Sequence, residues 1–342
     1  MSKTIAELSV RGRELLGTEY AIMGGAMSWV SERHLVSAIS NAGAFGVIAA
    51  SSMPSELLDK EIKATQAMTQ KPFGVNLILM HPQLDELMDV CIANNVTHLV
   101  LAGGIPRGPQ VQKLKEAGIK VIAFTPTNAI GKKLVKMGVD GIVIEGHEAG
   151  GHIGPVSTSV LAQEILPVLR EVPVFVAGGI GRGEAIAAYL EMGASGVQLG
   201  TRFVCASESI AHANFKNAFI KANARDAIPS VQYHPDFAVI PVRAISNKAA
   251  EEFTRFQKET VEKVFSGHMD KEAGQLAIEH FWAGALRKAV IDGDIERGSL
   301  MAGQSVGMVQ CIQPTQEIID ELVSQAALYL SKTHKLSFPE FA

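Results

Sequence analysis

The chain has 342 residues, of which 47% are hydrophobic and 19% charged, and its formal net charge is −4. This composition is typical of globular proteins and excludes a disordered or fibrous chain. The charges are scattered without blocks, so they indicate neither a nucleic acid nor an anionic membrane as a partner. Apolar runs end before the roughly 20 residues that a membrane span needs, and the N-terminus lacks the apolar region of a signal peptide. We therefore expect a cytoplasmic protein.

The cysteines are Cys91, Cys205 and Cys311, and they lie far apart in the chain. They form no C-x-x-C pair, so the sequence predicts neither a disulfide framework nor a zinc site. We expect each of them to be a small buried residue.

Eight short runs rich in Val and Ile recur through the first 200 residues. They begin at Tyr20, Phe45, Phe73, Thr97, Ile119, Asp140, Pro173 and Gly196. Because these runs are hydrophobic on both faces, they are typical of strands buried in a parallel sheet. Amphipathic stretches of helical length separate them, among them 54–68, 83–94, 128–137, 157–170 and 183–192. The pattern predicts alternating strands and helices.

Glycines mark the ends of several predicted helices. Gly43, Gly118, Gly138 and Gly193 each stand between an amphipathic stretch and the next apolar run. Glycine adopts the left-handed conformation that ends a helix without steric cost, so these positions support the boundaries independently of hydrophobicity.

Eight strand and helix units are the count of a closed TIM (β/α)8 barrel, and an open doubly wound sheet is the alternative. We favour the barrel, because no strand is followed by an early G-x-G-x-x-G. The alternation stops after residue 206. We therefore predict a barrel formed by residues 1–206 and 313–342, with a final amphipathic helix over 314–332, and a helical cap subdomain at 207–312 over the barrel mouth.

The carboxyl ends of barrel strands form the active face, and two neighbouring ends are rich in glycine. The seventh strand ends in Gly178 and Gly179, and the eighth carries Gln198, Gly200 and Thr201. Exposed backbone N–H groups beside a helix start make a cradle for an anion, so we predict a phosphate site here. We expect a side chain placed at Gly178 or Gly179 to occupy the phosphate space.

The sixth strand ends in Glu145, followed by a polar, glycine-rich loop that includes His147, Glu148 and His152. Its two histidines are five residues apart, unlike the H-E-x-x-H zinc pattern, so no metal site is predicted. A histidine on such a loop suits proton donation or polarisation of a carbonyl. We assign this role to His152 and expect His147 to face solvent.

Two further strand ends suit a planar ligand. Gly24, Gly25 and Met27 follow the first strand with little bulk, and Asn76 on the third strand offers an amide to the edge of a heteroaromatic ring.

Five segments together resemble a known family: 73–76 (FGVN), 148–154 (EAGGHIG), 177–180 (AGGI), 198–203 (QLGTRF) and 298–304 (GSLMAGQ). They resemble the FMN-dependent nitronate monooxygenase (2-nitropropane dioxygenase) superfamily. Within it, they are most similar to the flavin-dependent enoyl-acyl-carrier-protein reductases of the FabK type, which serve fatty acid biosynthesis. The resemblance runs from about Glu19 to Ala327.

This resemblance implies an oxidoreductase with FMN across the barrel mouth. The flavin ring would lie against Gly24, Gly25 and Met27 and contact Asn76, and Glu145 would contact the ring or the ribityl chain. The phosphate would be held by Gly178, Gly179, Gln198, Gly200 and Thr201. His152 would be the catalytic or substrate-orienting residue.

Three activities fit these residues. The first is an enoyl-acyl-carrier-protein reductase that uses NADH or NADPH to reduce an enoyl thioester, and we favour it. The second is a nitronate monooxygenase that oxidises alkyl nitronates with O2. The third is a flavin-free lyase or isomerase of a phosphorylated sugar, for which Glu145 and Glu148 are the only candidate bases. The expected partner is a small-molecule or acyl-carrier-protein-bound substrate, and a homodimer is compatible with the sequence.

Overall fold

A computed structural model describes residues 4–237 and 239–333 of the chain, except for the side chain of Glu279. Eight parallel strands form one sheet in the order β1-β9-β8-β6-β5-β4-β3-β2. Their bounds are β1 Ile22–Gly24, β2 Gly46–Ala49, β3 Phe73–Ile78, β4 His98–Ala102, β5 Lys120–Phe124, β6 Gly141–Glu145, β8 Val174–Ala177 and β9 Gly196–Leu199. Each lies within one of the eight predicted apolar runs. The seventh and eighth strands of the sequence analysis are β8 and β9.

The two edges of this sheet meet, so the strands form a barrel. Met23 of β1 makes a parallel bridge to Phe45, just before β2. Phe45 donates its N–H to the carbonyl of Ile22 at 2.9 Å, and Gly24 donates to the carbonyl of Phe45 at 2.8 Å. The expected TIM-barrel fold is therefore confirmed.

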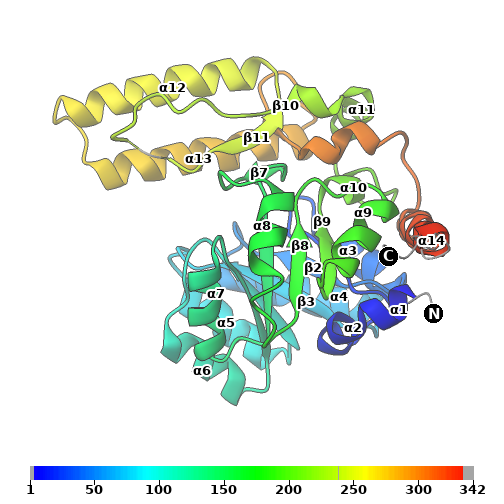
Figure 1. Ribbon diagram of the computed structural model, residues 1–342. Helices are drawn as coiled ribbons and strands as arrows, with labels where there is room; N and C mark the ends of the chain where they lie inside the picture. The colour runs from blue at the N-terminus through cyan, green and yellow to red at the C-terminus, as the bar shows by residue number, and fades with distance from the viewer. Residues whose placement is uncertain (1–3, 238, 334–342) are drawn as a thin grey trace, which may run out of the picture.

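Helices cover the outside of the barrel (Figure 1). Their bounds are α1 Ile5–Leu8, α2 Val10–Leu16, α3 Arg33–Asn41, α4 Ser55–Met68, α5 Leu84–Ala93, α6 Gly108–Glu116, α7 Asn128–Lys136, α8 Thr158–Ile165, α9 Gly183–Glu191, α10 Thr201–Val204 and α14 Thr315–Thr333. The glycines expected to end helices, Gly43, Gly118, Gly138 and Gly193, all have φ between 77° and 103°. These glycines therefore have the left-handed conformation that the sequence predicts for a glycine at the end of a helix.

The amino end of the barrel is closed by α2. Leu15 and Leu16 of this helix belong to the apolar cluster inside the barrel, together with Phe45 and Phe175. The carbonyl oxygen of Leu15 is 2.8 Å from Nε2 of His98 and accepts a hydrogen bond of 2.7 Å from Nζ of Lys120. The polar groups at this end are therefore used to hold the closing helix.

Segment 207–312 forms a second lobe, which includes helices α11 Ala213–Lys221, α12 Lys248–Phe265 and α13 Lys271–Val290 and the short 3-10 helices η1 Ala224–Asp226 and η2 Gln304–Met308. Helices are present as predicted, but the strands of this segment are not among the predicted elements. It also contains the strands β10 Ala227–Pro229, β11 Val242–Ile245 and β12 Leu300–Met301, which form a small antiparallel sheet. The helix pair α12 and α13 has its own apolar cluster around Phe253 and Trp282.

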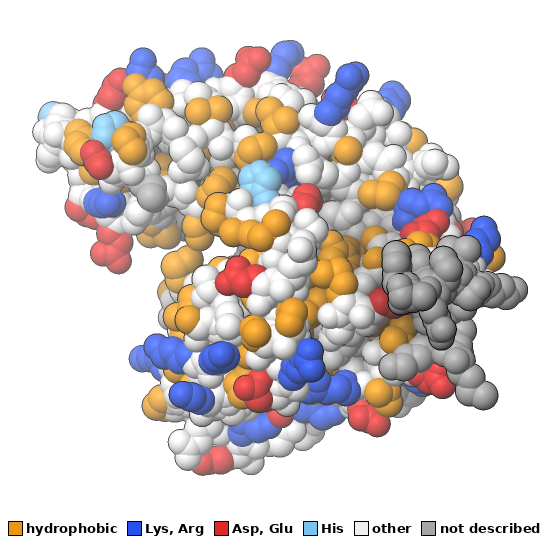
Figure 2. Space-filling model, in the orientation of Figure 1, with side chains coloured by type: hydrophobic (Ala, Val, Ile, Leu, Met, Phe, Trp, Pro, Cys, Tyr) orange, Lys and Arg blue, Asp and Glu red, His pale blue; other side chains and the backbone are white. Residues whose placement is uncertain are grey.

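A two-residue strand from the barrel joins this small sheet. β7, Gly151–His152, follows β6 and pairs with β11. Figure 1 shows the α12–α13 pair beyond β7, at the end of the barrel where the strands finish. Figure 2 shows a hollow at one side, between this lobe and the barrel. None of the helices in the described part of the chain is long and apolar enough to cross a membrane.

The packing of α9 against α14 generates a testable prediction. A Cβ at Gly183 would overlap the carbonyl oxygen of Leu322, so Gly183→Ala forces the two helices apart. We expect it to reduce the free energy of unfolding by about 1 to 3 kcal/mol, the usual cost of overpacking. Gly284→Ala on α13 is the control, because no atom lies within 4 Å of its added Cβ. There we expect a gain of about 0.5 to 1 kcal/mol from helix propensity. Urea unfolding of both variants measures the difference, and equal effects would contradict the proposed clash.

Candidate active site

Three polar side chains face the inside of the barrel near its carboxyl end. Asn76 is in register with Val100, and both Glu145 and Gln198 are in register with Ala177. Val100 and Ala177 belong to the interior apolar cluster, and residues in register on neighbouring strands point to the same face of a sheet. These three predicted site residues are therefore brought together at one end of the barrel.

Their hydrogen bonding differs. The Asn76 amide donates to the carbonyl of Val100 at 2.9 Å, so one of its donors is used by the barrel itself. The side chains of Gln198 and Glu145 have no hydrogen-bond partner among the described residues, although Gln198 is only 8% exposed. Neither side chain has polar atoms among the fully buried unpaired ones, so both remain accessible from the barrel mouth, where polar groups without a protein partner suit a ligand.

The Glu145 carboxyl is electrostatically unusual. Burial raises its pKa from the ordinary 4.5 to about 7, and the charge that His152 carries when protonated acts in the opposite direction. A carboxyl group with such a pKa changes protonation state near neutral pH.

The ends of β8 and β9 present free backbone donors. Gly178 and Gly179 both have left-handed φ, at 94° and 74°. Their N–H groups and that of Gly200 have no hydrogen-bond partner within residues 4–237 and 239–333. Thr201 begins α10 at the same place, but its hydroxyl already accepts a hydrogen bond of 3.0 Å from the N–H of Gly303. That bond uses a lone pair of the hydroxyl oxygen and leaves its O–H free, so the backbone N–H groups and the threonine hydroxyl both offer donors to an anion.

The two glycines after β8 are required by their backbone conformation and by their surroundings. A Cβ at Gly178 would lie 3.0 Å from the carbonyl oxygen of Gly146, and one at Gly179 would lie 2.9 Å from Cβ of Glu148. A side chain would thus meet the loop after β6, and the left-handed φ of both residues disfavours it further, as expected. That a bulky side chain would also occupy the phosphate space stays a prediction. These glycines let that loop approach the cradle closely.

Gly24, Gly25 and Met27, at the end of β1 and in the loop after it, have different surroundings. A Cβ at Gly24 would lie 2.7 Å from Cδ1 of Ile39, so Gly24 is needed for packing against α3, outside the barrel. Gly25 faces the backbone of Gly200, and a Cβ at Gly200 would lie 3.4 Å from Sδ of Met27. Gly25 and Met27 therefore lie beside the start of α10.

Two residues of this loop were missed by the sequence analysis. The hydroxyl of Ser31 donates to the carbonyl of Gly25 and accepts from the N–H of Met27, both at 3.0 Å. Trp29 has φ of 67°, rare for a bulky residue, and the guanidinium of Arg287 on α13 lies 5.8 Å from its ring centroid. Backbone strain of this kind persists where the surroundings enforce it. No local sequence signal marks either contact.

The loop after β6 is more ordered than its composition predicts. His152 is exposed on β7, opposite Val242 of β11. His147, expected to face solvent, is half-buried, with Nδ1 3.0 Å from the carbonyl oxygen of Gly154. The Glu148 carboxylate accepts hydrogen bonds of 2.8 and 2.9 Å from the N–H and hydroxyl of Thr158 at the start of α8. These hydrogen bonds join Glu148 to α8 and hold the loop. Its carboxylate is therefore not free to act as a catalytic base.

Residues 298–304 lie against this loop. Gln304 donates its N–H to the carbonyl of Glu148 at 2.9 Å, and a Cβ at Gly150 would overlap the backbone of Ala302 and Gly303. The resemblance had included this segment, but neither hydrophobic pattern nor spacing indicated that it reaches the site.

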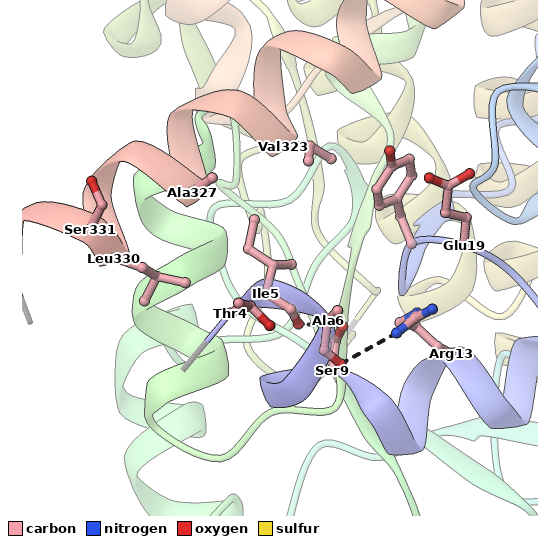
Figure 3. A pocket seen from close by; sticks show the side chains of 11 residues that line it. Thr4, Ile5, Ala6, Ser9, Arg13, Glu19, Val323, Ala327, Leu330 and Ser331 are labelled. Atoms are coloured by element: carbon pink, nitrogen blue, oxygen red, sulfur yellow. Dashed lines mark hydrogen bonds between the residues drawn. The ribbon is translucent and has the colours of Figure 1, made fainter. Parts of the chain in front are cut away.

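A cavity of about 440 Å³ lies elsewhere, between α1, α2 and α14 (Figure 3). It is lined by Ile5, Arg13, Glu19, Val323 and Leu330 among others, and by none of the candidate site residues. In the described residues, no group of three or more His, Cys, Asp or Glu side chains could hold a metal ion. Cys91 and Cys205 are buried as expected, but Cys311 is exposed, so that expectation is wrong for this cysteine.

The geometry therefore combines an anion cradle of backbone N–H groups, unpaired polar side chains at the barrel mouth and an exposed histidine beside them. These features fit a phosphate-bearing planar cofactor. The profile of the "Nitronate monooxygenase" family matches the chain in two overlapping segments, 11–101 and 82–325. The chain belongs to this family of oxidoreductases, whose members are flavin enzymes.

Three similar proteins are named for different functions. FabK from Thermotoga maritima has 34% sequence identity, and the similarity covers 95% of this chain and 98% of that one with a TM-score of 0.84. A 5-hydroxy-7a-methyl-1-oxo-octahydro-1H-indene-4-carboxyl-CoA dehydrogenase from Rhodococcus jostii is 28% identical. This similarity covers 92% of the present chain and 94% of the Rhodococcus chain. A probable nitronate monooxygenase from Staphylococcus saprophyticus is also 28% identical, over 94% and 98%.

The raised pKa of Glu145 predicts a pH-dependent stability. Between about pH 4.5 and 7 the unfolded chain releases this proton while the folded flavin-free protein keeps it, so the free energy of unfolding falls as pH rises through this window. The loss amounts to about 3 kcal/mol at most. Glu145→Gln should remove it.

Urea unfolding at pH 5 and pH 8 measures this effect. Glu56→Gln, at the exposed start of α4, is the control. The same pH dependence in Glu145→Gln as in the wild type would contradict the prediction.

Proposed function

We propose that this protein is an FMN-dependent reductase that uses NADH or NADPH to reduce the carbon–carbon double bond of an enoyl thioester, such as one carried on acyl carrier protein. The proposal has two parts, the cofactor and the substrate, and each has its own support. The substrate assignment also rests on a role for His152.

The observation that carries the cofactor assignment is the cradle at the ends of β8 and β9. Gly178, Gly179 and Gly200 direct no N–H to another described residue, and Gln198 beside them is buried and unpaired. These groups would hold the FMN phosphate, because backbone N–H groups near a helix start favour anions. Gly25, Met27, Asn76 and Glu145 would lie along the flavin. When bound, FMN supplies the hydride chemistry that no side chain of the protein can supply.

The comparisons support a thioester substrate. The sequence resembles FabK-type enzymes, and the FabK of Thermotoga maritima matches nearly the whole chain. The Rhodococcus jostii relative is named for a CoA-linked substrate, which is also a thioester. The resemblance to FabK-type reductases and the name of the Rhodococcus jostii relative thus both favour a carrier-bound or CoA-bound acyl group as the substrate class.

We assign to His152 the role of acting on such a substrate. It is exposed on β7, where the barrel meets the second lobe, and it interacts electrostatically with Glu145. Addition of hydride to the β-carbon of an enoyl thioester develops negative charge on the carbonyl oxygen. A protonated imidazole donates a hydrogen bond or a proton to that oxygen, and such donors are typical of enolate-forming sites.

Oxidation of alkyl nitronates is the second candidate, because the staphylococcal relatives are named as probable nitronate monooxygenases. In that reaction His152 would orient an anionic substrate, and no pyridine nucleotide would be needed. A flavin-free lyase or isomerase is disfavoured, since it lies outside the family to which the chain belongs.

Cofactor content and electron donor give the first test. We expect the purified protein to be yellow and to release FMN on denaturation, because the site offers one phosphate cradle and no dinucleotide fingerprint. Anaerobic stopped-flow absorbance then follows bleaching by NADH, NADPH and propyl nitronate in separate experiments. Bleaching by a pyridine nucleotide with recovery on adding an enoyl thioester supports the reductase. Bleaching by the nitronate alone would establish the second candidate, and a colourless protein that FMN does not reconstitute would exclude both.

The variant His152→Ala tests the proposed role of the histidine. It should keep FMN and its bleaching by NAD(P)H, because the proposed phosphate and ring contacts come from other strands. Turnover of the enoyl thioester should fall by roughly 100-fold or more, as for a lost general acid or oxyanion donor. His147→Ala is the matched control on the same loop. Full turnover in His152→Ala with confirmed flavin content would leave His152 without this role.

A further inference from the structure

Arg243 on β11 is a buried charge that neither the comparisons nor the proposed reaction explains. Its side chain is among the largest that are fully buried, with 2% of the residue exposed. Within residues 4–237 and 239–333 no carboxylate forms an ion pair with it. Burial lowers the pKa of its guanidinium, and Glu148 is the carboxylate that opposes this shift. Such burial is costly, so the side chain must be held there by hydrogen bonds.

Those hydrogen bonds join two parts of the molecule. Nε of Arg243 donates to the carbonyl oxygen of His147 at 3.1 Å, in the loop after β6. Nη1 donates to the carbonyl oxygen of Ala227 on β10, in the second lobe. The planar guanidinium holds its donors at fixed angles, so it sets the distance and direction between the two carbonyl groups.

The strand register connects this bridge to the proposed catalytic histidine. Arg243 is the partner of Gly151, and Val242 is the partner of His152. The N–H of Ile153 donates to the carbonyl of Pro241 at 2.9 Å, which continues the same pairing. β11 therefore holds one side of the loop through its backbone, and the guanidinium of Arg243 holds the other side at His147.

We propose that Arg243 is the positioning residue of the active site: it fixes the loop 146–154 against the second lobe, so that His152 is presented to the substrate. It acts through the loop backbone and touches neither substrate nor cofactor. Its effect on turnover rests on the proposed function, whereas its effect on the loop does not.

Loop order is tested first, in the flavin-bound full-length protein. Arg243→Met keeps an unbranched side chain but removes the guanidinium and all its donors, and Arg243→Lys keeps the charge but not the paired geometry. Arg225→Met is the matched control, because Arg225 lies in the same lobe with an 88% exposed side chain. Hydrogen exchange should increase in residues 146–154 in both Arg243 variants and stay unchanged in the barrel strands and in Arg225→Met. Unchanged exchange in this loop would overturn the proposal.

Turnover is tested next by separating the two half-reactions. Bleaching by NAD(P)H should remain near the wild-type rate, while reoxidation by the enoyl thioester should fall roughly 100-fold, the size expected from a displaced catalytic group. A third variant, Arg243→Ala, removes the side chain beyond Cβ. Added guanidinium ion should partly restore its reoxidation by the enoyl thioester, whereas sodium chloride at equal ionic strength should not. Equal losses in both half-reactions would overturn the positioning role.

If Arg243→Met does not fold, Arg243→Lys provides the same comparison. A wild type that does not reduce enoyl thioesters would refute the proposed function, and the exchange experiment would still decide whether Arg243 orders the loop.

Discussion

The active end of this protein depends on the close approach of three backbone segments that only glycine permits. A Cβ at Gly146 would overlap Thr158, one at Gly150 would overlap Gly303, and one at Gly178 would press on the carbonyl of Gly146. The loop after β6 is thereby enclosed between the end of β8 and residues 302–304. This close packing brings the loop that carries His152 next to the glycines with free N–H groups.

The two ends of the barrel use their buried polar groups in opposite ways. At the amino end His98 and Lys120 both bind the carbonyl of Leu15, and burial lowers the pKa of His98 to about 4. A neutral imidazole suits this structural role. At the carboxyl end the side chains of Glu145 and Gln198 form no hydrogen bond to any other residue that the structure describes. Stability is therefore obtained at one end, and polar groups remain available for a ligand at the other.

The barrel was predictable because its signals are local. Each strand is a short apolar run, and each glycine after a helix has the left-handed φ that its position indicated. The small sheet was not, since β7 has two residues and its partner β11 lies some 90 positions further along the chain. Arg243 could not be found for the same reason. At Gly178 and Gly179 the need for glycine was recognised, but the direction of the missing side chain depends on a loop that folds back from β6.

The two tryptophans of the chain lie in different parts of the molecule. Trp29 is in the loop after β1, beneath Arg287, and Trp282 packs on Phe253 in the apolar cluster of the α12–α13 pair, with ring centroids 4.2 Å apart. Each indole N–H is buried without a partner. Replacing either tryptophan by phenylalanine consequently leaves a single tryptophan in one part. The emission of Trp29 then reports the barrel mouth, and that of Trp282 reports the second lobe, without any added dye.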